Sequence, residues 1–112
     1  MIIHNYQTSK MKQNPHHVDV RKLYDKDSAQ VMHITLKPGE SLKPHKTPVD
    51  VAFYILEGTP NIHIGEESSE AGKDDLIESP ADIVHYISNE SKALARIMVI
   101  KAPRPEKQTK VL

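Results

Sequence analysis

Hydrophobic residues occur along the chain in short runs, most of which alternate apolar and polar positions with the period of a β-strand. In residues 30–36 (QVMHITL) every second residue is large and apolar, namely Met32, Ile34 and Leu36. Further runs of strand length lie at residues 17–24, 61–64, 76–78, 83–88 and 93–100. Turn signals such as Lys37-Pro38-Gly39 separate them, and no run of helical period reaches the about 10–12 residues of a convincing helix. The pattern predicts an all-β fold, a sandwich or barrel.

Residues 51–56 (VAFYIL) form a run that is apolar on both faces. The two faces consist of Val51, Phe53 and Ile55, and of Ala52, Tyr54 and Leu56. A strand on the outside of a barrel normally keeps one polar face, so something must cover both faces here. In a chain of 112 residues we expect the second cover to be another copy of the chain, which predicts a homodimer. Covering by the N-terminal segment of the same chain is the alternative.

The chain has the length of one domain, and its composition divides it into three parts. Residues 29–102 contain the regular strand pattern and form the predicted barrel. Residues 1–28 form an N-terminal segment that could supply a strand shared with a dimer partner. Residues 103–112 carry prolines and charges, which indicates a tail. Residues 66–75 (EESSEAGKDD) are polar and turn-rich, which predicts a loop.

Charge and composition limit the classes of partner. Lys and Arg number 15, as do Asp and Glu, so no net positive field attracts nucleic acid or an anionic membrane. The longest apolar run is far shorter than the about 20 residues of a membrane-spanning helix. The absence of cysteine excludes disulfides and thiolate chemistry. The N-terminal residues lack the apolar stretch of a secretion signal, so a cytoplasmic location is expected.

Two spaced motifs carry the candidate chemistry. The first begins at Gly39, reaches His45 after five residues, continues through Thr47 and Val51, and ends at Gly58. The second motif contains two aspartates where turns are expected, and it is formed by Asp74, Pro80, Asp82, His85 and Asn89. Aspartate is one of the few residues that tolerate left-handed backbone, so both turns can form.

These motifs resemble the two signatures of the cupin family, G-x5-H-x-H-x3,4-E-x6-G and G-x5-P-x-G-x2-H-x3-N, in the correct order. The resemblance covers about residues 31–100 and implies a double-stranded β-helix, a barrel of the jelly-roll type. Metal-binding cupins usually use two histidines and a glutamate from the first signature and one histidine from the second. Here the second histidine position holds Thr47 and the glutamate position holds Val51.

Only His45 and His85 therefore remain as candidate ligands for a divalent metal such as Zn, Fe, Mn or Ni. Asp50 is a weaker third ligand, because it precedes Val51 and should point to the opposite side of the strand. By the same alternation His33 and His63 should point outward. His16 and His17 could bind a metal as a pair, but for neighbouring residues of an N-terminal loop a solvated position is the simplest expectation.

The resemblance places a ligand pocket inside the barrel, formed by His45, Thr47, Val51, Phe53 and His85. The leading hypothesis is a barrel that binds a small molecule, with polar contacts from the histidines and an apolar wall from Val51 and Phe53. The alternative is a metal-dependent cupin enzyme, an isomerase, epimerase or dioxygenase acting on a sugar or small organic acid. A third possibility is a structural module whose dimer face is the functional surface.

Overall fold

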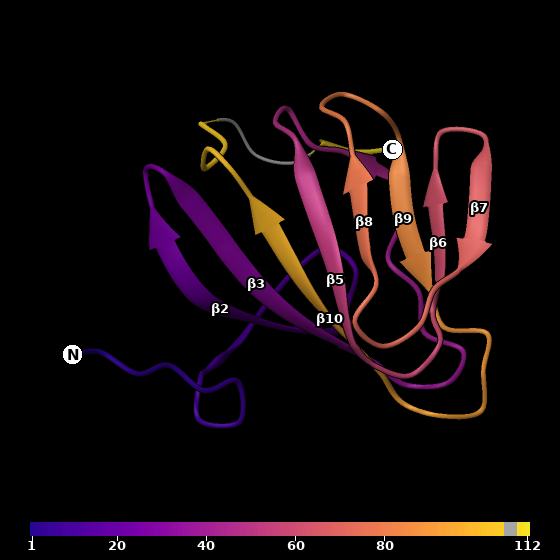
Figure 1. Cartoon of the computed structure of the whole chain (residues 1–112), viewed down its shortest axis with the longest axis horizontal. Coiled ribbons are helices and arrows are strands. Elements are labelled where there is room, and N and C mark those ends of the chain that lie inside the picture. The colour runs from indigo at the N-terminus through magenta and orange to yellow at the C-terminus, as the bar shows by residue number, and fades with distance from the viewer. Residues whose placement is uncertain (107–109) are drawn as a thin grey trace.

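The alternating runs of the sequence form β-strands that pair into two antiparallel sheets (Figure 1). The computed structural model describes residues 1–106 and 110–112. In this part of the chain the larger sheet contains, in order, β1 (Met11–Lys12), β2 (Asp19–Lys26), β3 (Ala29–Leu36), β10 (Ala95–Lys101), β5 (Val51–Glu57) and β8 (Leu76–Ser79). The smaller sheet contains β11 (Lys110–Val111), β4 (His45–Lys46), β9 (His85–Ser88), β6 (Asn61–Ile64) and β7 (Glu67–Glu70).

The predicted all-β class is confirmed, and the described residues contain no helix. In particular, most of the run at residues 93–100 belongs to strand β10 (Ala95–Lys101), between β3 and β5. No helix that is long and apolar enough to cross a membrane occurs in the described ranges. The loop predicted at residues 66–75 is wrong in part, because Glu67–Glu70 form strand β7 beside β6. This strand lies at the sheet edge with every residue exposed, so it lacks the apolar alternation that reveals buried strands.

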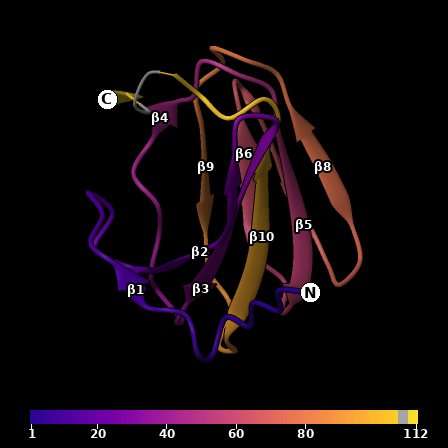
Figure 2. The same cartoon turned by 90° about the vertical axis from the view of Figure 1, so that its left-hand side faces the viewer.

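The two sheets face each other (Figure 2). The core between them consists mainly of side chains that strand alternation turns inward. Phe53, Ile55, Leu36, Ile87 and Ile97 are almost completely buried. The complete buried apolar set is Val18, Val20, Met32, Ile34, Leu36, Leu42, Val51, Phe53, Ile55, Ile62, Ala71, Ile87, Ala95, Ile97 and Val99. Its members come from both sheets, as the period of two in the sequence predicts.

The turns expected at the two aspartates are present. Asp74 and Asp82 have φ values of 72° and 63°, in the left-handed region where most residues other than glycine are strained. Gly58 has a φ of 81° and lies so close to the chain that an added Cβ would stand 2.3 Å from the carbonyl oxygen of Leu94. Gly58 ends β5, and Asp74 and Asp82 lie in the loops that lead into β8 and β9.

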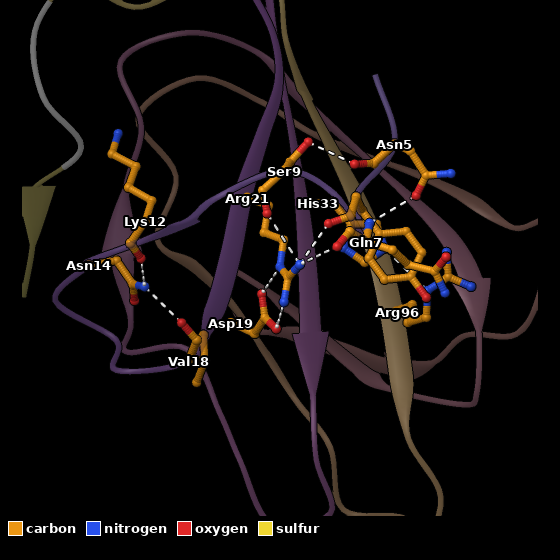
Figure 3. A network of polar contacts seen from close by, with 11 residues as sticks. Asn5, Gln7, Ser9, Lys12, Asn14, Val18, Asp19, Arg21, His33 and Arg96 are labelled. Carbon is orange, nitrogen blue, oxygen red and sulfur yellow. Dashed lines mark hydrogen bonds and ion pairs between the residues drawn. The ribbon is translucent and has the colours of Figure 1, made fainter. Parts of the chain in front are cut away.

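An N-terminal arm, residues 1–10, contacts the outer face of the larger sheet through its second half (Figure 3). The guanidinium group of Arg21 on β2 donates hydrogen bonds to the carbonyl oxygens of Tyr6, Gln7 and Ser9. The ring of Tyr6 stacks on the imidazole of His33. Part of the outer face is therefore covered by the same chain.

The ends of the chain also join the sheets. Residues 19–26 of the N-terminal segment pair with β3 as strand β2, within one chain. The tail predicted at residues 103–112 returns to the barrel, where Lys110–Val111 pair with β4. A two-residue strand leaves no periodic signal, so the sequence pattern does not reveal this pairing. Residues 107–109 of the predicted tail lie outside the described residues. A strand shared with a dimer partner stays a prediction.

Candidate functional site

A cavity of about 420 Å³ opens between the two sheets and is lined by residues from both of them. One part of its wall is apolar, formed by Val20, Met32, Ile34, Val51, Phe53 and Val99. Another part is polar, formed by His16, His45, Thr47, His85 and Lys101. All five residues of the predicted pocket line this cavity. The two signatures thus place their surviving histidines at one site.

The imidazoles of His45 and His85 meet at the centre of the polar wall. Their residues are register partners where β4 pairs with β9, and the ring centroids are 4.5 Å apart at an angle of 69°. The ring of Phe53 contacts His85 edge-on, with centroids 5.2 Å apart. Two residues far apart in the sequence therefore converge, because the pairing of two strands brings them together.

Both ring nitrogens of His85 have hydrogen-bond partners. Its Nδ1 lies 2.6 Å from the hydroxyl oxygen of Ser79, and its Nε2 lies 3.2 Å from that of Thr47. Burial lowers the pKa of His85 from 6.5 to about 4, and the nearby His45 and Lys101 act in the same direction. His85 is therefore a neutral imidazole at neutral pH, held in place by two hydroxyl groups.

His16 is a member of this site that the sequence interpretation missed. Its Nδ1 accepts a hydrogen bond from the backbone N–H of Lys43, while the carbonyl oxygen of Lys43 accepts one from Nδ1–H of His45. One peptide segment therefore fixes both rings, whose centroids are 4.9 Å apart. In their neutral forms, His16 carries its proton on Nε2 and His45 keeps a lone pair on Nε2.

Asn14 shapes the loop that carries His16 to the cavity. Its side-chain amide donates to the carbonyl oxygens of Lys12 and Val18 (Figure 3). Its Oδ1 accepts a hydrogen bond from the backbone N–H of His16. These contacts close a compact loop between β1 and β2. The loop is defined by this amide rather than by hydrophobic periodicity, so the expected solvated position of His16 is wrong.

Lys101 is the second residue that was missed. On β10 the residues Ala95, Ile97 and Val99 face inward and are buried, and Lys101 continues the same alternation at the end of the strand. Its register partners Gln30 on β3 and Val51 on β5 also line the cavity. Burial lowers the pKa of Lys101, and the charge of Lys12 adds to this effect.

The other candidate residues lie away from this site. Asp50 is exposed, and its carboxylate accepts a hydrogen bond from the backbone N–H of Ala81. It therefore holds the turn before Asp82 and does not line the cavity with His45 and His85. His63 stacks on Tyr86 with ring centroids 4.1 Å apart. His33 faces outward as predicted but is buried beneath the N-terminal arm.

Comparison with known proteins agrees with this geometry. A family profile described as Cupin domain matches residues 32–101, more than half of the chain. The chain belongs to the cupin family. An uncharacterized protein of Methanocaldococcus jannaschii, MJ0764, is 26% identical to this cupin over 89 residues, which are 79% of the chain and 77% of that protein.

Solved structures show the same double-stranded β-helix. TT1209 from Thermus thermophilus is 27% identical to this cupin, with a TM-score of 0.80 over 94% of this chain and 100% of the other. The polyketide cyclase RemF from Streptomyces resistomycificus has a TM-score of 0.84 over 100% of this chain and 85% of its own, with 19% identity. At that identity the likeness to RemF extends to the fold alone.

The residues of this cupin do not fit the metal site that the family implies. The two hydroxyl groups occupy both nitrogens of His85, and Val51 stands in the glutamate position without a donor atom. In the described residues, no group of three or more histidine, cysteine, aspartate or glutamate side chains is arranged to hold a metal ion. Sites for zinc or iron typically have three protein ligands, so the donor set here is incomplete.

Proposed function

We propose that this cupin binds a small organic molecule in the cavity between its sheets, without a metal. The observation that carries the proposal is the cavity itself, about 420 Å³ in volume, with an apolar wall facing a polar one. Pockets for small ligands commonly measure about 300–1,000 Å³ and combine an apolar lining with a few polar groups. The site has both properties.

The arrangement of the polar wall indicates that its side chains contact a ligand and do not only pack in the protein interior. His45 and His85 are fixed by hydrogen bonds to Lys43, Thr47 and Ser79, so their rings are held in place before any ligand enters. A pre-organised site loses little conformational entropy on binding, which favours affinity. The backbone at these two residues is held by the pairing of β4 with β9 in the smaller sheet.

A fragment screen by protein-observed NMR on the tag-free chain tests the proposal. We expect bound fragments to shift the amide signals of cavity residues such as Thr47, Val51 and Phe53. Val51→Phe should abolish these shifts by filling the cavity from β5. Ala52→Phe is the matched control, because residue 52 is on the opposite face of the same strand and is absent from the cavity lining.

Two results would count against the proposal. If no compound shifts the cavity signals, or if Val51→Phe binds the same compounds as the wild type, the cavity is not a ligand site. Elemental analysis of the same tag-free protein tests the metal-free part. A ratio near one metal ion per chain that is lost in His45→Ala or His85→Ala would overturn it.

A further inference from the structure

His16 and His45 are neighbouring cavity residues whose outer ring nitrogens have opposite hydrogen-bonding roles. Nδ1 of His16 accepts a hydrogen bond of 2.8 Å from the backbone N–H of Lys43. Nδ1–H of His45 donates one of 2.7 Å to the carbonyl oxygen of Lys43. These contacts fix the tautomers of the neutral rings. Nε2 is therefore a donor in His16 and an acceptor in His45.

Both rings are neutral at neutral pH, so this pair of roles is the ordinary state of the site. Burial, and next the nearby His45, lower the pKa of His16 from 6.5 to about 4. Burial also lowers the pKa of His45, although its hydrogen bond to Lys43 acts in the opposite direction. The tautomers themselves follow from the backbone contacts and not from these pKa values.

Neither Nε2 atom has a hydrogen-bond partner in the part of the chain that the structure describes. The two rings are not bonded to each other, and their planes are tilted by 55°. Among the described residues, the one buried side-chain nitrogen or oxygen without a partner is Nδ1 of His33, so both Nε2 atoms are accessible. His85 differs, because hydroxyl groups engage both of its nitrogens.

The backbone of Lys43 strengthens both outer groups. A donor at Nδ1 of His16 makes its Nε2–H a better donor, and an acceptor at Nδ1–H of His45 makes its Nε2 a better acceptor, because hydrogen bonds in a chain polarise one another. A ligand that satisfies both rings must accept from His16 and donate to His45. A primary amide or a lactam has its C=O and an N–H on one edge, and its planar group loses little conformational entropy on binding.

Building on the proposed function, we infer that the ligand class is small neutral carboxamides, either primary amides or lactams. The carbonyl oxygen would accept from Nε2–H of His16, and the N–H would donate to Nε2 of His45. The hydrocarbon part would lie on the apolar wall, which includes Met32, Phe53 and Val99. A ketone or a carboxylate has no donor and would leave the lone pair of His45 without a partner, which is costly at a buried residue.

Matched pairs of amides and ketones test this class by isothermal titration calorimetry. The pairs are benzamide with acetophenone and hexanamide with 2-heptanone, in which a methyl group replaces the NH2 group and the shape is nearly unchanged. The protein is the full tag-free chain at neutral pH. We expect each amide to bind at least about fivefold more tightly than its ketone, because only the amide pairs the buried acceptor. Benzoate should bind more weakly than benzamide.

Two variants that keep an aromatic ring separate the two roles. His45→Phe should remove the advantage of the amide and leave ketone affinity within about twofold. His16→Phe should weaken amide and ketone to the same extent, because both ligands use the carbonyl oxygen there. His17→Asn is the matched control, since His17 is exposed on the same loop and asparagine tolerates its φ of 57°. If a variant does not fold, the two ligand pairs on the wild type decide the class.

The possible failures are distinguishable. If the ketones bind as tightly as the amides, or if benzoate binds more tightly than benzamide, the carboxamide class is wrong while the ligand pocket stands. An amide advantage that persists in His45→Phe would overturn the role of that ring as the acceptor. Unchanged affinities in His16→Phe would overturn the role of the other ring as the donor. If no fragment of any class shifts the cavity signals, both this inference and the proposed function are wrong.

Discussion

Tyr6 lies flat on His33, with ring centroids 4.0 Å apart and an angle of 13° between the planes. The guanidinium carbon of Arg96 is 4.3 Å from the centroid of the Tyr6 ring, and Nε of Arg96 donates to Nε2 of His33. The N-terminal arm is therefore attached to the outer face of the larger sheet by ring stacking, a cation–π contact and the hydrogen bonds of Arg21.

Removal of the Tyr6 ring should destabilise the protein. We expect Tyr6→Ala to lower the free energy of unfolding by about 1–2 kcal/mol, the sum of a lost aromatic pair and a lost cation–π contact. Urea denaturation followed by circular dichroism measures the change. Tyr24→Ala is the control, because Tyr24 is exposed on β2 and should cost much less. Equal effects of the two substitutions would contradict the role of the arm as a fixed cover.

His33 should make the protein less stable in mild acid. Burial, and next the charge of Arg96, lower the pKa of His33 from 6.5 to about 4. The unfolded chain therefore takes up a proton at this residue as the pH falls through 6.5, while the folded chain remains neutral until about pH 4. The contribution of His33 is complete above pH 6.5 and is lost between these values, at about 1 kcal/mol per pH unit.

Urea denaturation at several pH values between 4 and 7 measures this loss. Because His16 and His85 have pKa values lowered in the same direction, the test is the difference between the wild type and His33→Gln. That variant should lose less stability in the acid range, whereas substitution of the exposed His4 should leave the curve unchanged. Parallel curves for the wild type and His33→Gln would show that His33 is not the source.

Two glycines with nearly the same backbone angle should differ in their tolerance of alanine. Gly39 and Gly58 have φ values of 84° and 81°, so alanine is strained at both. A Cβ at position 39 would meet nothing within 4 Å, whereas one at position 58 would stand 2.9 Å from the Cα of Ala95. Gly39→Ala should cost about 1 kcal/mol, and Gly58→Ala at least about 3 kcal/mol because backbone must move. Similar unfolding midpoints for the two variants would contradict this packing.

Sequence spacing could predict the parts of the site that are fixed by strand period and turn chemistry. His45 and His85 converge because each follows a turn at a set distance, and the left-handed turns at Asp74 and Asp82 form as expected. The contacts of Asn89 give a physical reason for an amide at the last position of the second signature. Its buried side chain donates to the carbonyl oxygens of Leu36 and Ala93 and joins the loops around β9.

The missed parts depend on contacts between distant segments. His16 reaches the cavity because Asn14 folds the loop and Lys43 binds its ring, and neither contact has a periodic signal. Lys101 is different, since its position could be found by extending the alternation of β10 by one step beyond Val99. Its charge set it apart from the apolar run at residues 93–100, so it was not assigned to the pocket.

The outer face of the larger sheet should bind a second copy of the chain. One row of register partners crosses this face from His33 through Met98 and Tyr54 to Leu76, and the N-terminal arm contacts it at His33. Leu76, at the other end, is 54% exposed. The apolar tip of the arm, residues 1–3, is also exposed and projects from the body of the chain (Figure 1). A two-fold arrangement would cover both surfaces.

Sedimentation velocity across a range of protein concentrations tests the dimer. We expect a dimer for the wild type and a dissociation constant raised at least about tenfold in Leu76→Glu, because a charge would be buried at the interface. Leu94→Glu is the control, since Leu94 is exposed but lies outside this row of partners. A monomer at every concentration would show that the arm alone completes this face.

Restoring the two missing ligands should convert the pocket into a metal site. Thr47 has its hydroxyl oxygen 3.2 Å from Nε2 of His85, and Val51 lines the same cavity, so both positions already face the histidines. Thr47→His with Val51→Glu would supply, with His45 and His85, the four donors that the family signatures contain. The substitution at position 47 also removes the hydroxyl that occupies Nε2 of His85.

We expect the double variant to bind about one Zn²⁺ or Ni²⁺ per chain by elemental analysis. Metal at a hundredfold excess over its dissociation constant should raise the free energy of unfolding by about 3 kcal/mol. Thr47→His with Ala52→Glu is the matched control, because it places the carboxylate on the opposite face of β5. If this control binds metal as well as the double variant does, the inward register of Val51 does not define the site. Retention of the metal after a further His85→Ala change would show that the second signature does not contribute a ligand.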